Sequence, residues 1–179
     1  MKTTFKQWLE ETSTIPQLDA KTRQAFPNTR KRQNDTNSVI PMSNMMMFAP
    51  NPQKQELVID SRTRSPRSGT MHVQRIMLYK VEFGNVGENG VTPLPNTQVG
   101  IKPYKLTADT ARVACDCMDF RFRFAQQNHN DDSLAGNPPP AYNKVPGSNR
   151  PEANPSGLPG MCKHLMRIVQ ELKQKRIVV

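Results

Sequence analysis

The sequence is short of the large apolar side chains that build a protein core. Hydrophobic residues occupy 35% of its 179 positions and aromatic residues 6%, while 16 positions are proline. A chain of this length forms one domain, or one domain with a long arm, and this composition limits the size of its core. We therefore expect a structural metal or partner subunits to contribute stability that apolar burial does not supply.

The chain also lacks the hydrophobic stretches of membrane and secreted proteins. It has no run of 18 apolar residues, so the sequence predicts no membrane-spanning helix and no membrane partner. Residues 1–11 are polar and contain no apolar segment typical of a signal peptide. The sequence thus predicts a cytoplasmic rather than a secreted protein, in which cysteines stay reduced.

Recognisable catalytic motifs are missing as well. The sequence has no G-x-S-x-G motif, no glycine-rich phosphate loop followed by Lys-Ser/Thr, and no carboxylates paired in a motif. The only side chains suited to be nucleophiles are cysteines, for which the spacing indicates another role. We therefore expect a protein that is not an enzyme and has no small-molecule substrate.

Positive charge, in contrast, is abundant. The chain carries 25 Lys and Arg residues against 15 Asp and Glu residues, which gives a net charge of +10 and a pI near 9.9. This balance favours an acidic partner, either nucleic acid or a negatively charged protein surface.

The three cysteines and one of the three histidines fall into two close pairs. Cys115 and Cys117 form a C-x-C pair, and Cys162 and His164 form a C-x-H pair. Both members of each pair can reach one point, and sulfur and imidazole nitrogen are preferred ligands of tetrahedral zinc. The sequence predicts a Cys3His site for Zn(II). Because four protein ligands leave no position for water, the site is expected to be structural rather than catalytic.

Other roles for the cysteines stay open at this stage. Cys115 and Cys162 could form a disulfide that leaves Cys117 unpaired, the C-x-C pair could be redox-active, or all three could be buried core residues. The histidines His72 and His129 lie outside the paired spacing. We expect neither of them to bind the metal.

The C-x-C…C-x-H spacing resembles that of the SWIM zinc finger, and the resemblance spans roughly residues 74–176. In that family the first pair lies at the end of a β-hairpin and the second pair opens a helix. Here residues 111–114 alternate like a strand before the first pair, and residues 165–169 follow the second pair at helical spacing. The resemblance implies zinc binding, and SWIM fingers are often proposed to bind nucleic acid.

A longer set of features resembles small SWIM-like proteins of large tailed bacteriophages. These features are the segment CDCMDFRFRF at 115–124, a Pro/Asn-rich insertion, and the segment PGMCKHL at 159–165. The resemblance implies a virion component, at the neck, tail or baseplate, and therefore a location in the virion.

Patterning along the chain predicts an α+β fold for a SWIM-like module over residues 71–179. Three β-rich segments, at 72–83, 99–106 and 111–115, favour a small antiparallel β-meander. A C-terminal helix is expected from about Cys162 to Arg176, and the zinc site would staple it to the meander.

A Pro-rich insertion at 126–160 separates the two ligand pairs. Long loops inside compact domains are usually functional or disordered, and here zinc would hold both ends. We expect this insertion to be a protein-contact surface, with Tyr142 as a candidate anchor.

Residues 1–70 show little periodicity and are interrupted by prolines and basic clusters, which predicts a long irregular N-terminal arm. Within the arm, residues 3–11 have apolar side chains at helical spacing, so a short helix is expected there. The segment Glu56–Asp60 is expected to form a short strand that pairs with the edge of a neighbouring sheet.

The segment Met118–Phe124 alternates phenylalanine with arginine. In a strand this pattern would place Phe120, Phe122 and Phe124 on one face, whereas the four-residue spacing of Phe120 and Phe124 also fits a helix. We expect these phenylalanines to lie in the core, and the alternative is a surface on which bases stack.

Two functional classes follow. The first is a non-catalytic structural or interaction protein that binds neighbouring protein subunits in an assembly, because the core is small and the arm is long. The second is a nucleic-acid-binding SWIM module, which the charge of +10 favours. The location of the basic side chains, around the zinc or along the arm, would distinguish the two.

Overall fold

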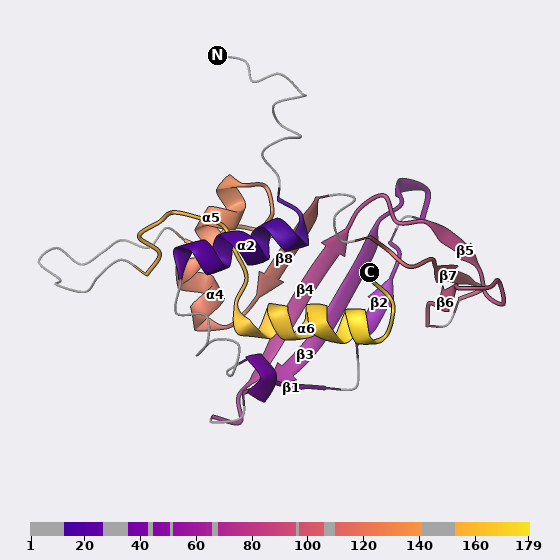
Figure 1. Ribbon diagram of the computed structural model, residues 1–179, viewed down its shortest axis with the longest axis horizontal. Helices are drawn as coiled ribbons and strands as arrows, with labels where there is room; N and C mark the ends of the chain where they lie inside the picture. Colours follow the sequence, from indigo (N-terminus) through magenta and orange to yellow (C-terminus); the bar gives the residue numbers. More distant parts are fainter. Residues whose placement is uncertain are drawn as a thin grey trace, which may run out of the picture.

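The chain is an α+β protein with two antiparallel sheets and a C-terminal helix, shown as a computed structural model in Figure 1. The structure describes residues 13–26, 36–42, 45–50, 52–65, 68–95, 97–105, 110–140 and 153–179. The expected helix at 3–11 and the candidate anchor Tyr142 lie outside the described residues.

The main sheet is built around strand β3, which pairs along its whole length with β4. The strand order is β1-β3-β4-β8, and the short strand β2 pairs with β3 on the same side as β1. The strands are β1 (Ile40–Pro41), β2 (Met46–Phe48), β3 (Leu57–Arg64), β4 (Met71–Leu78) and β8 (Ala111–Cys115).

A second, smaller sheet has the order β5-β7-β6 and contains β5 (Phe83–Asn85), β6 (Thr92–Pro93) and β7 (Val99–Ile101). The predicted meander is therefore wrong in its middle strand, because β4 pairs directly with β8 and residues 99–101 belong to the other sheet. Lys80, with a φ of 55°, takes the chain out of extended geometry just after β4 ends.

Of the helices, the C-terminal one lies across one face of the main sheet, and the others gather on the β8 side of the sheet (Figure 1). The helices are α2 (Ile15–Ala25), α4 (Met118–Arg123), α5 (Ala125–Asn130) and α6 (Lys163–Gln174), with a 3-10 turn η1 (Pro52–Lys54) before β3. Helix α2 begins with a capping box between Thr14 and Gln17. The predicted C-terminal helix is confirmed as α6, which contacts β1, β4 and β8.

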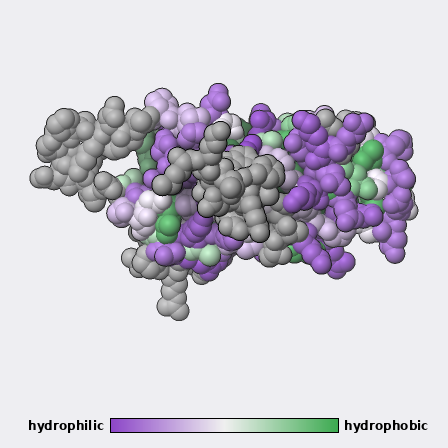
Figure 2. Space-filling view, turned by 90° about the horizontal axis from the view of Figure 1, so that it is seen from above, coloured by the Kyte–Doolittle hydropathy of each residue, from purple (hydrophilic) through white to green (hydrophobic). Residues whose placement is uncertain are grey.

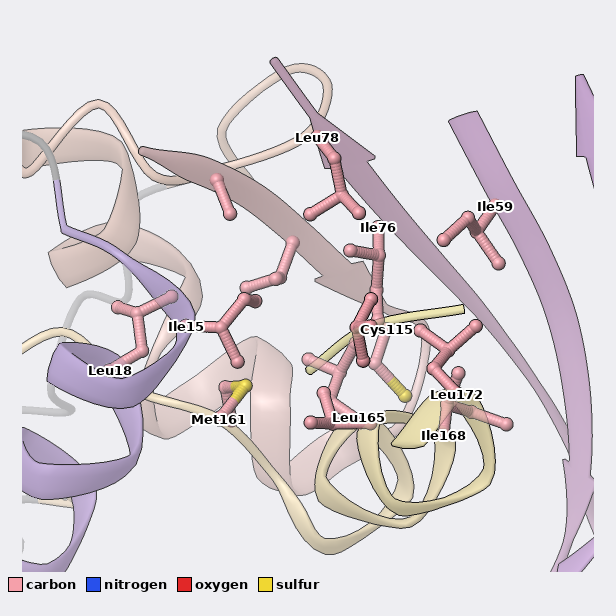
Figure 3. Close-up of a cluster of buried hydrophobic side chains, with 14 of the residues drawn as sticks. Ile15, Leu18, Ile59, Ile76, Leu78, Cys115, Met161, Leu165, Ile168 and Leu172 are labelled. Carbon is pink, nitrogen blue, oxygen red and sulfur yellow. The ribbon is translucent and has the colours of Figure 1, made fainter. Parts of the chain in front are cut away.

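The core lies between the inner face of the main sheet and helices α2 and α6. Alternate residues of β4 and β8, among them Ile76 and Val113, point to this side. From α6 they meet a stripe at helical spacing, Leu165, Ile168, Val169 and Leu172. Figure 3 shows that the Cys115 side chain lies in the same layer as these apolar groups.

The expectation of an irregular arm over residues 1–70 is corrected for the described part of that range. Helix α2 buries Ile15 and Leu18 in the core, and β3 is an internal strand with neighbours on both sides. The segment Glu56–Asp60 therefore contributes to the chain's own sheet, not to the edge of a neighbouring one. The alternation of β3 is hidden in the sequence because Val58, on its outer side, is also buried.

The segment of alternating phenylalanine and arginine is helix α4, so its strand-like alternation was misleading. Phe120 and Phe124 are buried as expected, whereas Phe122 is 42% exposed. The period of 3.6 residues explains this difference, since Phe122 lies on the opposite side of the helix from the other two.

Seen from above, most of the described surface is hydrophilic (Figure 2). Among the described residues, no helix has both the length and the apolar character that a membrane span requires.

Candidate metal centre

The four predicted ligands come from three neighbouring elements. Strand β8 ends at Cys115, and Cys117 is the N-cap of α4. Cys162 is the N-cap of α6, and His164 lies in its first turn. Residues far apart in the sequence meet here because α6 packs against β8. The sequence expectation that one pair follows a strand and the other opens a helix is thus confirmed.

The ligand atoms converge on one point in the protein interior. All four residues are buried, and their sulfur and nitrogen atoms lie within 4.8 Å of one another. The Nδ1 atom of His164 lies 4.0 Å from the sulfur of Cys115 and 4.0 Å from the sulfur of Cys162. Ligands of a tetrahedral zinc ion lie about 3.5–3.8 Å apart, given metal–ligand distances of about 2.0–2.3 Å. The cluster therefore fits a metal ion with little rearrangement.

The ring of His164 is oriented by a second contact. Its Nε2 atom lies 3.2 Å from the hydroxyl oxygen of Ser65, which is also buried. This contact leaves Nδ1 facing the three sulfur atoms. A hydrogen bond to the far nitrogen is the usual way in which proteins fix a metal-binding imidazole.

Two of the sulfur atoms accept hydrogen bonds from groups outside the cluster. The amide Nε2 of Gln74 donates to Cys115 over 3.7 Å, and the backbone N–H of Phe120 donates to Cys117 over 3.4 Å. Gln74 is fully buried and also donates to the hydroxyl of Thr63. These donors favour the thiolate form, which is the form that binds metal.

Sequence reasoning missed Ser65 and Gln74. Ser65 has no spacing pattern that would identify it. Gln74 does carry a signal, because it is a fully buried polar residue on the same side of β4 as Ile76 and Leu78. A buried polar side chain needs partners, and the register that places Gln74 opposite Cys115 supplies them.

A second histidine lies beside the cluster without belonging to it. The ring centroids of His72 and His164 are 4.4 Å apart, and Nδ1 of His72 lies 3.1 Å from a carboxylate oxygen of Asp116. Asp116, between the two ligand cysteines in the sequence, also accepts the backbone N–H of Val73. The cluster includes neither His72 nor the exposed His129.

The pKa values of the three thiols are shifted in different directions. Hydrogen bonds from the thiols of Cys115 and Cys162 lower the pKa of Cys117 far below its usual range. Donation to Cys117 raises the pKa of Cys115, and burial, followed by hydrogen bonds to the other two sulfurs, raises the pKa of Cys162. These opposite shifts make Cys117 the most acidic of the three thiols.

We expect zinc to release about two protons when it binds the metal-free chain, since Cys115 and Cys162 must lose theirs and Cys117 has none to lose. Protons and metal compete for the same sulfur atoms, so the apparent zinc affinity should fall as the pH decreases. A pH indicator in weakly buffered solution measures the release. Release of three protons would contradict the thiolate at Cys117.

The disulfide alternative does not describe this arrangement, because all three cysteines are free and buried. Comparisons with protein-family models, with curated proteins and with solved structures found no match to this chain. The buried Cys3His cluster, which could hold a metal ion, is therefore the feature from which function has to be argued.

Proposed function

We propose that the chain is a non-catalytic, zinc-stabilised structural protein that binds neighbouring subunits of a larger assembly. The closed ligand set carries this proposal: four buried protein ligands surround one point. A catalytic metal keeps a coordination position open for water or substrate, and a set of four protein ligands does not.

The choice of zinc rests on the ligand chemistry. Three thiolates and one imidazole are soft or intermediate ligands, and magnesium and calcium prefer oxygen. When bound, zinc would be held by Cys115, Cys117, Cys162 and His164, and it would connect β8, α4 and α6. The small apolar content of the chain makes such a connection valuable for stability.

We further propose that the centre is of the SWIM type and that the protein is a phage virion component. The order of elements supports the first part, because a strand precedes the C-x-C pair and a helix begins at the C-x-H pair. The second part rests on the resemblance of the sequence segments around both pairs to SWIM-like phage proteins.

Metal content tests the proposal at its base. Elemental analysis of the purified wild-type chain is expected to find close to one zinc ion per chain, and much less in Cys162→Ser, because the variant loses the most deeply buried sulfur ligand. The exposed His129 provides the control, since His129→Ala should keep the wild-type content. Zinc-free wild-type protein, prepared reduced, would contradict the proposal.

One observation favours the second candidate, a nucleic-acid-binding module. Lys173 in the last turn of α6, and Lys175 and Arg176 just after the helix, are exposed and have no acidic partner among the residues that the structure describes. Binding of single-stranded or duplex DNA that weakens steeply with salt, and that charge reversal at these positions abolishes, would establish this function instead.

A further inference from the structure

The exposed apolar side chains are concentrated on one face of the molecule. Of the nine large hydrophobic residues that are exposed within the described ranges, five come from three strands of the main sheet. These five are Ile40, Met46, Phe48, Met71 and Val73. Apolar clusters of this kind on a soluble protein commonly mark a contact surface.

The strand register places all five on the outer face, opposite the core. In an antiparallel pair, residues directly opposite each other point to the same side of the sheet. Met46 lies opposite Asp60, and Asp60 opposite Arg75, whereas the neighbouring row, through Ile59 and Ile76, points to the core.

The remaining exposed residues fall into parallel rows on the same side. Ile40 and Met71 both lie opposite Arg64, and Val73 lies opposite Arg62. Phe48 lies opposite Val58. This set of strand residues is called the outer face below.

The charges of the outer face are unbalanced. Arg75 pairs with Asp60 over 2.7 Å, and Arg112 pairs with Asp132 over 2.7 Å. Arg62 and Arg64 are exposed and have no acidic partner among the described residues. The five strands of the sheet contain four arginines and no lysine. Methionine and arginine are enriched at protein–protein contacts and lysine is depleted there.

A shallow hollow interrupts the outer face next to the metal centre. It has a volume of about 230 Å³ and is lined by Val73, Arg75, Ala114 and Asp116, among others. Because Asp60 and Asp116 also line the hollow and Asp60 pairs with Arg75, the hollow suits an apolar side chain of a partner, whose carboxylates would lie nearer Arg62 and Arg64.

We propose that the outer face is the docking surface for a different protein, one that presents an apolar centre flanked by carboxylates. This inference rests on the proposed function, since it names the surface and the partner chemistry through which the chain would bind a neighbouring subunit. The excess of positive charge at Arg62 and Arg64 selects an acidic partner.

Two other occupants fit the outer face less well. A second copy of this chain carries a net charge of +10 and would bring the same unpaired arginines to the contact. Single-stranded nucleic acid binds by stacking bases on aromatic side chains, and Phe48 is the aromatic residue among the exposed apolar ones here.

The test selects peptides from a random displayed library on the immobilised, metal-loaded full chain. The selected peptides are then synthesised and their affinity for the chain is measured. Selected peptides should combine apolar residues with Asp or Glu. Val73→Glu places a carboxylate in the centre of the outer face and should lower the affinity for these peptides about tenfold or more. Arg62→Glu should also lower the peptide affinity. Added salt should lower the peptide affinity of the wild type.

Val86→Glu is the matched control. Val86 is a 41% exposed valine beside the small sheet, against 48% for Val73, and lies off the outer face. The Val86→Glu variant should bind the peptides with the affinity of the wild type. Equal melting temperatures of the two variants would exclude misfolding as the cause of a difference.

The other outcomes overturn the inference in distinguishable ways. Peptides that bind Val73→Glu and wild type equally would place the protein contact elsewhere and leave the proposed function standing. A wild-type dimer in sedimentation that Val73→Glu dissociates would assign the face to a second copy. Oligothymidylate binding that Val73→Glu abolishes, with no peptide selected, would overturn both the inference and the proposed function.

Discussion

Removing the metal with a strong chelator is expected to unfold most of the described structure, with loss of helical and sheet signal in circular dichroism. Structural zinc contributes an apparent binding free energy of about 10–16 kcal/mol in small zinc domains at neutral pH. A typical domain is stable by only about 5–15 kcal/mol. A chain with 35% hydrophobic residues has little stability to spare when such a contribution disappears.

The position of the cluster explains why the effect should be global. Its ligands lie at the end of β8 and at the starts of α4 and α6, so loss of the metal frees all three elements at once. It also leaves three sulfur atoms buried among apolar side chains such as Leu165, where a thiolate is costly.

Two controls make this result specific. Added zinc should restore the spectrum, whereas magnesium should not, because it prefers oxygen ligands. His164→Ala should reproduce the effect of the chelator, and His129→Ala should not. A chelated chain that kept its melting temperature would show that the apolar core alone maintains the fold.

The Cys3His cluster could be predicted from the sequence because the spacing of its residues is local. The spacings of Cys115–Cys117 and Cys162–His164 bring each pair to one point whatever the rest of the fold is. The same holds for α6, whose apolar stripe has a clear helical period.

The sequence predicted strands at the positions of β4 and β8, but it did not predict how the strands of the main sheet pair, because pairing depends on residues far apart in the chain. Strand β3 has buried residues at Leu57, Val58 and Ile59 in succession, so it shows no alternation at its start. Strand β3 pairs with β4 and β2 in a fixed register, and the spacing of residues along one strand does not reveal that pairing. The sequence analysis therefore assigned β3, an internal strand of the sheet, to an irregular arm.

The insertion between the ligand pairs was likewise less irregular than its composition suggested. Within it, α5 contains Asn128, a fully buried residue. Its side chain accepts the backbone N–H of Gly160 over 2.8 Å and donates to the carbonyl of Gly160 over 3.1 Å. This pair of hydrogen bonds fixes the chain just before Cys162.

Gly160 lies where no side chain fits. A Cβ atom built there would lie 2.8 Å from Cε1 and 2.9 Å from Cδ1 of Phe124, and closer still to the hydroxyl of Thr22. That hydroxyl accepts the backbone N–H of Met161 over 2.8 Å. Residues of α2 and α5, and Phe124 between α4 and α5, thus all contact the chain at Gly160 and Met161. The backbone of Gly160 cannot move away from one of these contacts without disturbing another.

We expect Gly160→Ala to destabilise the chain by about 3 kcal/mol, which corresponds to a fall in melting temperature of about 6–12 °C. The clash is with a buried ring and with the Thr22 hydroxyl, which is itself held by hydrogen bonds, so relief requires movement of the segment that ends at Cys162. Zinc affinity, measured by competition with a chromogenic chelator, should therefore fall together with stability.

Gly136→Ala separates this steric effect from backbone strain. Gly136 has a φ of 110° and open space around its Cβ position, so alanine there meets strain without a clash and should cost about 1 kcal/mol. Asn128→Ala should approach the effect of Gly160→Ala, because it leaves both backbone groups of Gly160 unsatisfied. If Gly160→Ala lowered stability no more than Gly136→Ala, the second ligand pair would not depend on these contacts at Gly160, and the metal alone would position Cys162.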